Sequence, residues 1–307
     1  MHYDRNANVV KTREAHPSDW PAIEALINRA RHSCPALRPW EANLADEVSV
    51  VVEKGYSGDP GRTDRIQGAL LASSDASPVA WVRLASVDDD LDIGHWLDLS
   101  LPPILSALSN RGVRELAWMD CGGWAQTFLE TRGFSPLAEV ITLTKTDRHL
   151  PDALAQTVAE PSAPRITLRS AAEADLAAIA AIDRAAFEPH WWRSEATVRR
   201  RATTASRFTV AEYRGEVVGY TERELHLPMA HLDRIAVRPH VQGRGVGALL
   251  LSDALHTVWQ VGARTVSLNT QRHNDRSRRL YDRFGFKPTG DVVTVWTLAL
   301  SCIRAQL

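Results

Sequence analysis

The pattern of apolar and polar residues is clearest in the last third of the chain. Residues 232–237 carry apolar residues at both ends, Leu232 and then 235–237, and this short signal predicts a β-strand. After a glycine-dense turn, apolar residues recur at helical spacing, at Ala248, Leu251, Ala254, Leu255 and Val258. This spacing predicts an amphipathic helix whose apolar face packs on the preceding strand. Residues 262–263 end the helix, and residues 265–270 predict the next strand.

The residues ahead of this segment predict a strand, a helix and a hairpin. We expect a strand at 166–169 and an amphipathic helix at 174–184. Residues 208–213 and 217–223 predict two strands that are joined by a turn at Arg214 and Gly215. A basic helix precedes the hairpin, and we expect its arginines on a solvated face: Arg193, Arg199, Arg200 and Arg201.

The chain also contains an internal repeat of domain size. Residues 10–13 end in Arg13 and are followed by Asp19 and Ile23. Residues 166–169 end in Arg169 and are followed at the same spacing by Asp175 and Ile179. Later matches join 112–114 to 262–264 and 132–134 to 284–286. These matches predict a duplication, in which each half begins with a strand and an amphipathic helix.

The length of 307 residues suits two domains, each able to bury its own core. Residues 149–164 are rich in proline and small residues and are interpreted as a linker. We therefore expect a first domain at 1–148 and a second at 165–307.

The turn between the central strand and the helix is Gln242-Gly243-Arg244-Gly245-Val246-Gly247. A strand, a glycine turn and a helix N-terminus in this order form an anion site, because unpaired N–H groups point outward at the positive end of the helix dipole. A dinucleotide site would need an acid about 20 residues later, where Thr265, Val266 and Ser267 lie instead. A nucleotide-triphosphate loop would need Gly-Lys-Ser/Thr, which the turn lacks. A glycine turn without a ligand is the remaining alternative.

A second motif follows downstream and is made of Asn274, Ser277, Tyr281, Gly285 and Phe286. Together with Gln242, Gly245 and Gly247 it resembles the two signatures of the GNAT superfamily of N-acetyltransferases, Gln/Arg-x-x-Gly-x-Gly/Ala and Asn-x-x-Ser/Ala-x-x-x-Tyr-x-x-x-Gly-Phe. The resemblance covers about the last 140 residues. It implies an α/β (α+β) fold of two GNAT-like domains, each with a mixed, mostly antiparallel central sheet flanked by helices.

The resemblance also implies a site for acetyl-coenzyme A. The backbone of Ile235 and Val237 would hold the pantetheine arm and the acetyl carbonyl, where the central strand splays from its neighbour. The N–H groups of 243–247 would hold the pyrophosphate, and Arg244 with Arg278 or Arg279 would reach phosphate oxygens. The cofactor residues implied in this way are Ile235, Val237, Gln242, Gly243, Arg244, Gly245, Val246, Gly247, Asn274 and Arg278.

Direct acetyl transfer needs a neutral amine, a polarised thioester and a proton for the departing thiolate. By resemblance, Tyr281 would be the general acid. His231 occupies the position at which histone-acetyltransferase relatives have a glutamate base, and Asp233 lies on the same face of the strand. Glu222 and Glu224 are alternative bases, whereas Asn269 stands where ribosomal-protein acetyltransferases have a glutamate.

The first half departs from this pattern. Asp88, Asp89 and Asp90 lie where a phosphate turn belongs and would repel a pyrophosphate. The composition of this loop favours a solvated turn over a site for a divalent metal or a cationic substrate. Leu129 occupies the position of Tyr281, and Gly122 that of Asn274. The first domain is therefore interpreted as a degenerate acetyltransferase domain without a cofactor motif.

Composition excludes several other classes of protein. The net charge of −1 gives no argument for a nucleic-acid partner. Three cysteines, Cys34, Cys121 and Cys302, fit no metal spacing and are predicted to be reduced thiols. The chain shows no membrane-spanning apolar run, so a cytoplasmic protein without a metal is expected.

These observations predict an acyl-coenzyme A-dependent N-acetyltransferase that acts on a primary amine of a small molecule or a peptide. A tandem chain with a degenerate first half resembles the mycothiol synthases. The alternative is a non-catalytic acyl-coenzyme A sensor or scaffold, which would have no reason to keep an acid at Tyr281.

Overall fold

The structure is a computed structural model that describes residues 9–35, 48–55, 65–76, 78–151, 166–204 and 207–300. It divides into two compact units. The first holds the chain up to Leu137 and again from Val293, and the second holds Ala138–Val292. These units differ from the expected domains 1–148 and 165–307, because each half of the sequence supplies the last strand of the other unit. Most of the expected linker at 149–164 lies outside the described residues.

The first unit is built on a sheet with the strand order β1-β3-β4-β5-β6-β13. β5 and β6 are parallel and the other neighbours are antiparallel. A short strand, β2, pairs with β5 on the edge that β6 leaves open. The strands are β1 (Val9–Glu14), β2 (His32–Pro35), β3 (Val48–Gly55), β4 (Arg65–Ala76), β5 (Val79–Val87), β6 (Glu115–Asp120) and β13 (Lys287–Ala299).

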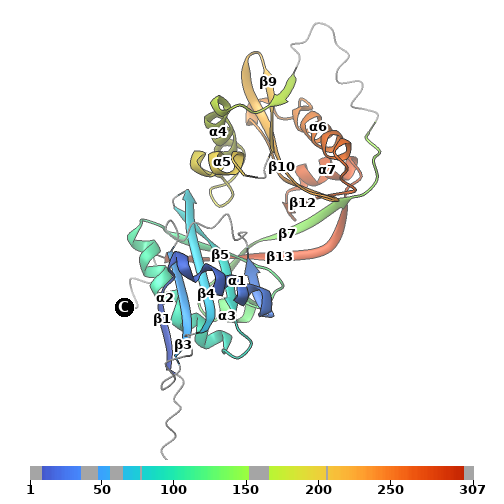
Figure 1. Ribbon diagram of the computed structural model, residues 1–307. Helices are drawn as coiled ribbons and strands as arrows, with labels where there is room; N and C mark the ends of the chain where they lie inside the picture. The colour runs from blue at the N-terminus through green and yellow to red at the C-terminus, as the bar shows by residue number, and fades with distance from the viewer. Residues whose placement is uncertain are drawn as a thin grey trace, which may run out of the picture. The chain divides into compact units, whose positions relative to one another are not determined.

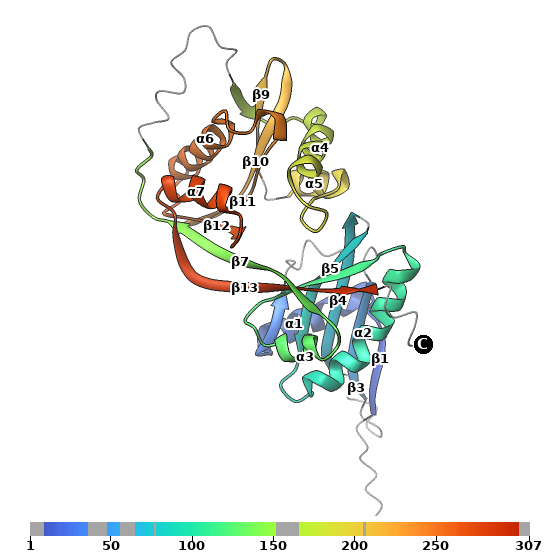
Figure 2. The same cartoon turned by 180° about the vertical axis from the view of Figure 1, so that it is seen from behind.

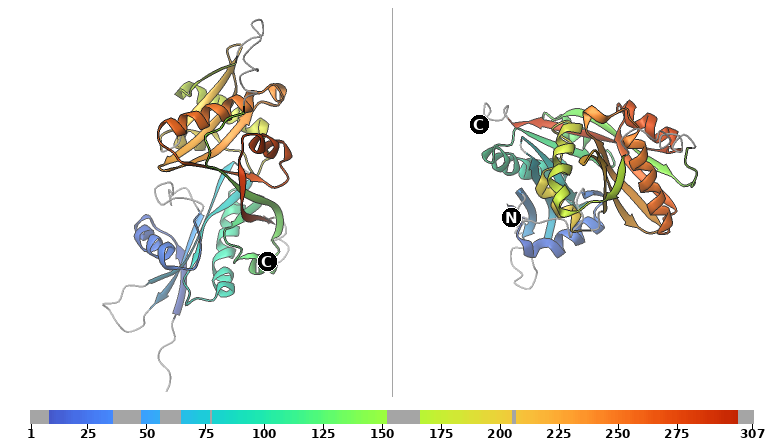
Figure 3. Two further views of the ribbon diagram at one scale, coloured as in Figure 1. Left: turned by 90° about the vertical axis from the view of Figure 1, so that its right-hand side faces the viewer. Right: turned by 90° about the horizontal axis from the view of Figure 1, so that it is seen from above.

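Helices cover both faces of this sheet, as Figures 1 and 3 show. Helix α1 (Trp20–Arg29) buries Ile23 and Leu26 against one face. Helices α2 (Ile93–Asn110) and α3 (Gln126–Glu130) pack on the other face, where Trp96 and Leu97 lie in the main core of the unit. Alternate residues of β3 and β4 enter these two cores because side chains alternate along a strand.

The second unit repeats this arrangement with the strand order β7-β12-β11-β10-β9-β8. β11 and β12 are parallel and the other neighbours are antiparallel. The strands are β7 (Ser135–Lys145), β8 (Thr167–Ser170), β9 (Arg207–Tyr213), β10 (Glu216–His226), β11 (Met229–Val237) and β12 (Thr265–Gln271). Helices α4 (Leu176–Ala186) and α5 (Glu195–Ala202) cover one face, and α6 (Val246–Gln260) and α7 (Asp275–Arg283) cover the other (Figure 2). The predicted fold class is confirmed in both units.

The predicted repeat is also confirmed at the start of each unit. Arg13 donates to both carboxylate oxygens of Asp19 at 2.6 and 2.8 Å, and Arg169 donates to those of Asp175 at 2.6 and 2.9 Å. In both units the aspartate ends a 3₁₀ turn and accepts a backbone N–H three residues earlier. One ion pair therefore fixes the same strand-to-helix corner twice.

Two expectations for the first half are wrong. Asp88 is not solvated: it is 6% exposed and forms ion pairs with Arg29 at 3.0 Å and Arg65 at 2.7 Å, whereas Asp89 and Asp90 are exposed. Cys34 and Cys121 are not reduced thiols, because they form a disulfide across 87 residues of sequence. Cys302 lies outside the described residues. Within the part of the chain that the structure describes, no helix is both long and apolar enough to cross a membrane.

Candidate active site

The glycine turn adopts a conformation that requires glycine. Gly243 and Gly245 have φ angles of +83° and +82°, in the left-handed region that side chains with a Cβ rarely enter. Gly245 is the N-cap of α6, and it has no side chain with which to cap the helix. The N–H groups of the first turn of α6 have no intrahelical acceptors, so they are available to an anion.

Gln242 connects this turn to the end of the central strand. Its Nε2 donates to the carbonyl oxygen of Val237 at 2.8 Å, and its Oε1 accepts from Arg276 at the start of α7. Arg244 and Arg278 are exposed, and Arg278 donates to the carbonyl oxygen of Arg272 at 3.0 Å. The two predicted signatures thus meet in space through Gln242 and Arg276.

The central strand β11 has one open edge. On one side it pairs with β10 as far as Val237, which lies opposite Gly219. On the other side its parallel pairing with β12 ends at Leu232, opposite Leu268. Within the described residues, no strand pairs with this edge at Ile235 or Val237. The end of β11 that lacks a strand partner on this edge therefore leads directly to the glycine turn.

A β-bulge on β11 changes which side chains share a face. Glu222 pairs with Arg234 and Arg223 pairs with Leu232, so Asp233 has no partner on β10. A bulge places two consecutive side chains of the bulged strand on one side. Asp233 and Arg234 both contact the α4–α5 region, and His231 lies on the same face of β11 as Asp233.

Charged side chains gather on this face. Arg193 donates to Asp233 at 2.9 Å and also to Glu222. Arg201 donates to Glu224 at 2.8 Å and to both Glu222 and Asp233. These five residues, Arg193, Arg201, Glu222, Glu224 and Asp233, are called the charge cluster below. The prediction of a solvated arginine face is wrong for Arg193 and Arg201, whose side chains are 16% and 17% exposed.

A second buried ion pair, between Arg234 and Asp183, lies next to the charge cluster. Arg234 donates to the carboxylate of Asp183 on α4 at 2.6 Å and to the carbonyl oxygen of Trp191 at 2.7 Å. Tyr220 also donates to Asp183, and burial together with this carboxylate holds the pKa of Tyr220 well above its usual value. These contacts fix the segment between α4 and α5 over β11.

The three carboxylates of the charge cluster all form ion pairs with Arg193 or Arg201. Burial alone would raise the pKa of Asp233, but the charges of Arg193 and Arg201 hold it far below its ordinary value. Oxygens of Glu222, Glu224 and Asp233 lie within 4.8 Å of one another, close enough to ligate one cation. Because guanidinium groups already occupy these oxygens, the cluster is a salt-bridge network in this structure.

His231, Asn274 and Tyr281 have well-defined surroundings. His231 Nδ1 lies 2.9 Å from Ser267 Oγ on β12. Asn274 is the N-cap of α7, and its Oδ1 accepts from the N–H of Ser277 at 3.1 Å. Tyr281 is 8% exposed and packs on Phe286 with the rings 5.9 Å apart, and burial raises its pKa to about 12.

Comparison with known proteins agrees with this geometry. The Acetyltransferase (GNAT) family matches residues 176–286, a range that includes both signatures and the charge cluster. These residues are an acetyltransferase domain of the GNAT family.

Two curated proteins and one solved structure illustrate the range of similarity. The chain is 38% identical over 77 residues to the spore coat polysaccharide biosynthesis protein SpsD of Bacillus subtilis, covering 25% of this chain and only 27% of SpsD. It is 25% identical over 275 residues to the mycothiol acetyltransferase of Nocardia farcinica, covering 80% of this chain and 88% of that protein. A tandem GNAT protein from the clavulanic acid biosynthesis pathway shares the fold, with a TM-score of 0.65 at 19% identity, covering 95% of this chain and 99% of that one.

The sequence pointed to the glycine turn, Asn274, Tyr281 and His231, but it missed Arg193 and Arg201 as partners of the cluster. The alternation Glu222-x-Glu224 on a strand was a signal, because two carboxylates on one buried face need counter-charges.

Proposed function

We propose that the second unit transfers the acetyl group of acetyl-coenzyme A directly to a primary amine. The observation that carries this proposal is the open edge of β11 at Ile235 and Val237, which runs into a glycine turn at the N-terminus of α6. Such an edge offers backbone hydrogen-bond groups to an extended amide-containing arm, and the turn offers N–H groups to a pyrophosphate.

The residues around the turn fit these roles. The left-handed glycines at 243 and 245 keep side chains away from the first turn of α6. A Cβ on Gly247 would lie 3.7 Å from Leu280, an ordinary van der Waals distance, so the packing of α6 on α7 does not by itself require a glycine at this position. Arg244 and Arg278, both exposed, supply cations for phosphate oxygens.

His231 is the proposed base. Ser267 Oγ lies 3.4 Å from the carbonyl oxygen of Ala230, to which it donates. The hydroxyl has a single proton, so His231 Nδ1–H donates to Ser267, and Nε2 carries the lone pair that accepts a proton from the ammonium. Asp233 stabilises the resulting imidazolium as a nearby negative charge. It does not itself take the proton, because its pKa is held too low for it to act as a base.

Tyr281 is the proposed acid. A pKa of about 12 keeps its hydroxyl protonated throughout the neutral range, so it is always available as a donor. A coenzyme thiol is a stronger acid than such a phenol, since an ordinary thiol has a pKa of roughly 8.5. The main contribution of Tyr281 is therefore a hydrogen bond to the negative charge that develops on sulfur.

The charge cluster points to the class of acceptor. Three carboxylates face two guanidinium groups, which leaves one negative charge on the face of β11 that carries His231. Residual negative charge attracts a cationic ammonium group and raises its local concentration. We infer that the acceptor is a small-molecule or peptide amine, with the acetylated amine of mycothiol biosynthesis as one candidate because of the likeness to the Nocardia farcinica protein.

The test is a panel of primary amines assayed for release of free thiol from acetyl-coenzyme A, with a parallel measurement of coenzyme A binding. We expect turnover with at least one amine, and its loss in His231→Gln with binding retained. A flat response across the panel, with tight binding intact, would support the sensor or scaffold instead.

A further inference from the structure

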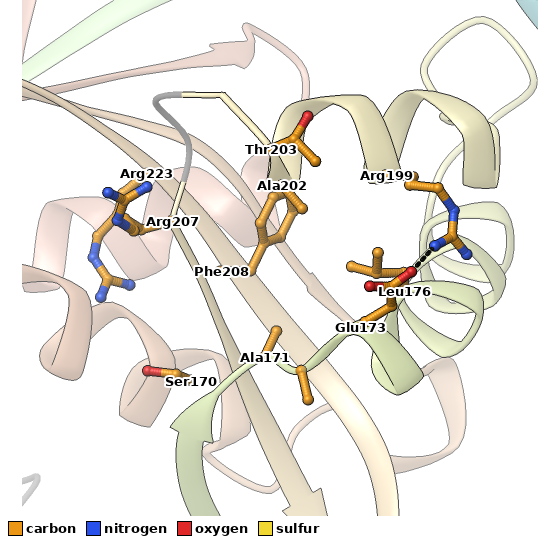
Figure 4. Close-up of a pocket in the computed structure, with 11 residues that line it drawn as sticks. Ser170, Ala171, Glu173, Leu176, Arg199, Ala202, Thr203, Arg207, Phe208 and Arg223 are labelled. Atoms are coloured by element: carbon orange, nitrogen blue, oxygen red, sulfur yellow. Dashed lines mark hydrogen bonds and ion pairs between the residues drawn. The ribbon is translucent and has the colours of Figure 1, made fainter.

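A pocket in the second unit is lined by residues that have no assigned part in acetyl transfer. It has a volume of about 320 Å³ and opens where β8 ends, α4 begins, α5 ends and β9 begins (Figure 4). Its lining consists of Ser170, Ala171, Ala172, Glu173, Leu176, Arg199, Ala202, Thr203, Arg207, Phe208 and Arg223. The volume suits a small organic molecule.

Arg223 is the unusual residue of this pocket. It is 7% exposed, and its Nη1 donates to Thr209 Oγ1 at 2.8 Å. Its Nε is buried and has no hydrogen-bond partner among the residues that the structure describes. Among the described residues, no carboxylate lies within ion-pair distance of this guanidinium, unlike Arg193 and Arg201 nearby. A buried charge without a counter-charge is costly, since burial favours paired ions.

The neighbouring strand brings a second positive charge close to Arg223. The register of β9 and β10 places Arg207 directly opposite Arg223. Like charges in a cross-strand pair repel one another. Burial lowers the pKa of Arg223, the charge of Asp253 on α6 opposes this, and the charge of Arg207 adds a smaller lowering. The buried guanidinium of Arg223 therefore lacks an ion-pair partner, and a bound anion would supply one.

The pocket also has an apolar wall and one ion pair of its own. Phe208 and Leu176 provide an apolar wall, and both belong to the core under α4 and α5. Glu173 pairs with Arg199 at 2.5 Å on the other side of the pocket, so its carboxylate is engaged there (Figure 4). The register of β9 and β10 places Arg207 and Arg223 on one face of these strands and Phe208 on the other, so the anion site is the positive end of the pocket and not its apolar wall.

We propose that this pocket binds a small anion, whose carboxylate or phosphate group lies against Arg223 and Arg207. The inference is independent of acetyl transfer, because none of these residues contributes to the cofactor turn or to the charge cluster. Bidentate recognition by guanidinium groups suits both carboxylate and phosphate oxygens.

The test uses the full chain with its glycine turn saturated by coenzyme A, so that added anions do not act there. Thermal unfolding is followed with benzoate or with inorganic phosphate, against chloride at equal ionic strength. The Nε–H signal of Arg223, assigned by its absence in Arg223→Met, is followed by NMR in the same titrations. We expect a saturable shift of this signal and a rise in Tm with at least one probe.

Variants separate the pocket from general anion effects. Arg223→Met and the more exposed Arg207→Gln should each weaken the binding of the effective probe at least tenfold. Arg200→Gln, on α5 outside the pocket, should leave it unchanged. A response to benzoate alone identifies a carboxylate ligand, and a response to phosphate alone identifies a phosphate ligand. An Nε–H signal that neither probe moves, or an equal rise in Tm in Arg223→Met, would overturn the proposal.

Discussion

The helices α2 and α6 begin at equivalent places in the two units but present opposite chemistry. The N-cap of α2 is Asp92, whose Oδ1 accepts from the N–H of His95 at 2.7 Å. The N-cap of α6 is Gly245, which provides no side chain. The first unit thus fills its helix N-terminus with its own carboxylate, whereas the second leaves it for a ligand.

The edge of the central strand is also occupied in the first unit and open in the second. Gly68 lies opposite Val87 in the first unit and Gly219 lies opposite Val237 in the second, so the two central strands can be aligned. In the first unit β2 pairs with the edge of β5 from Leu84 to Val87. The matching edge of β11 is unpaired among the described residues. An internal strand therefore occupies in one unit the place where we propose that acetyl-coenzyme A binds in the other.

The third difference lies at the bulge, which both units share. Leu71 lies opposite Leu84 and Ala72 opposite Val82, with Arg83 skipped. The matching positions in the second unit are Glu222 opposite Arg234, with Asp233 skipped. The fold accepts leucines at the positions of Glu222 and Arg234, so this cross-strand pair does not require charges. The charged residues of the second unit are better explained by their proximity to His231 than by stability.

The largest expected effect concerns Tyr281, whose counterpart is Leu129. Phe286 N donates to the carbonyl oxygen of Tyr281 at 3.0 Å, and Phe134 N donates to that of Leu129 at 3.1 Å, so the positions are equivalent. Tyr281→Phe should lower turnover on the order of 10²- to 10⁴-fold, about 3 to 5 kcal/mol of barrier. The dissociation constant of acetyl-coenzyme A should change only a few-fold, and Tyr213→Phe is the matched control. Undiminished turnover would remove Tyr281 from the mechanism.

The next effect concerns the stability of the charge cluster. Glu222 is fully buried between Arg193 and Arg201, so Glu222→Gln leaves two guanidinium groups with less compensation. We expect a loss of about 3 to 5 kcal/mol in the free energy of unfolding, measured in urea. Glu216→Gln on the same strand breaks an exposed pair with Arg238 and should cost less than about 1 kcal/mol. Equal losses of unfolding free energy in the two variants would show that the buried cluster contributes no more to stability than an exposed ion pair.

Gly245→Val tests the open helix N-terminus. A valine at φ +82° is strained and places a Cβ near the path of the pyrophosphate, so cofactor affinity should fall about tenfold or more, or about 1.4 kcal/mol. Gly215→Val, in the hairpin turn at φ +78°, introduces similar strain of about 1 to 3 kcal/mol away from the site. Its cofactor affinity should equal that of the parent. Calorimetric titration of both variants shows whether a loss of cofactor affinity comes from backbone strain or from a side chain that blocks the pyrophosphate.

Asp92→Ala tests the capped helix N-terminus of the first unit. Loss of the cap should cost about 0.5 to 2 kcal/mol of stability. Calorimetry should still give one molecule of coenzyme A per chain in both the parent and the variant, because β2 continues to occupy the edge of β5. Two equivalent sites in the parent would contradict the interpretation of the first unit as degenerate.

The smallest effect is one that both units should share. Hydrogen bonds from Arg13 and Arg169 lower the pKa values of Asp19 and Asp175 in the folded state. A carboxylate whose pKa is depressed on folding stabilises the protein above its unfolded pKa, near 4, and this stabilisation is lost as pH falls through the folded value. Each pair should contribute less than about 1 kcal/mol, since Arg13 and Arg169 are 39% and 41% exposed. Asp19→Asn and Asp175→Asn should each weaken the decline, below pH 4, of the free energy of unfolding measured in urea.

Features that arise from local chemistry are visible in the sequence alone. Only glycine enters the left-handed region freely, so the spacing of Gly243 and Gly245 is enough to mark the turn. Helical periodicity locates α6, and the match between Tyr281 and Leu129 follows from their distance to the Gly-Phe pairs that end α7 and α3. These patterns are carried by residues that are neighbours in the chain, so the order of residues suffices to predict them.

Features that depend on distant partners emerge only when the chain is folded. Nothing near Cys34 indicates Cys121, and nothing near Arg193 or Arg201 indicates the carboxylates of β10 and β11. The bulge at Asp233 is a property of two paired strands, so a single strand sequence does not reveal it. The exchange of β7 and β13 between the units has the same cause, because strand pairing is satisfied wherever a sheet offers an unpaired edge, whichever half of the sequence supplies the strand.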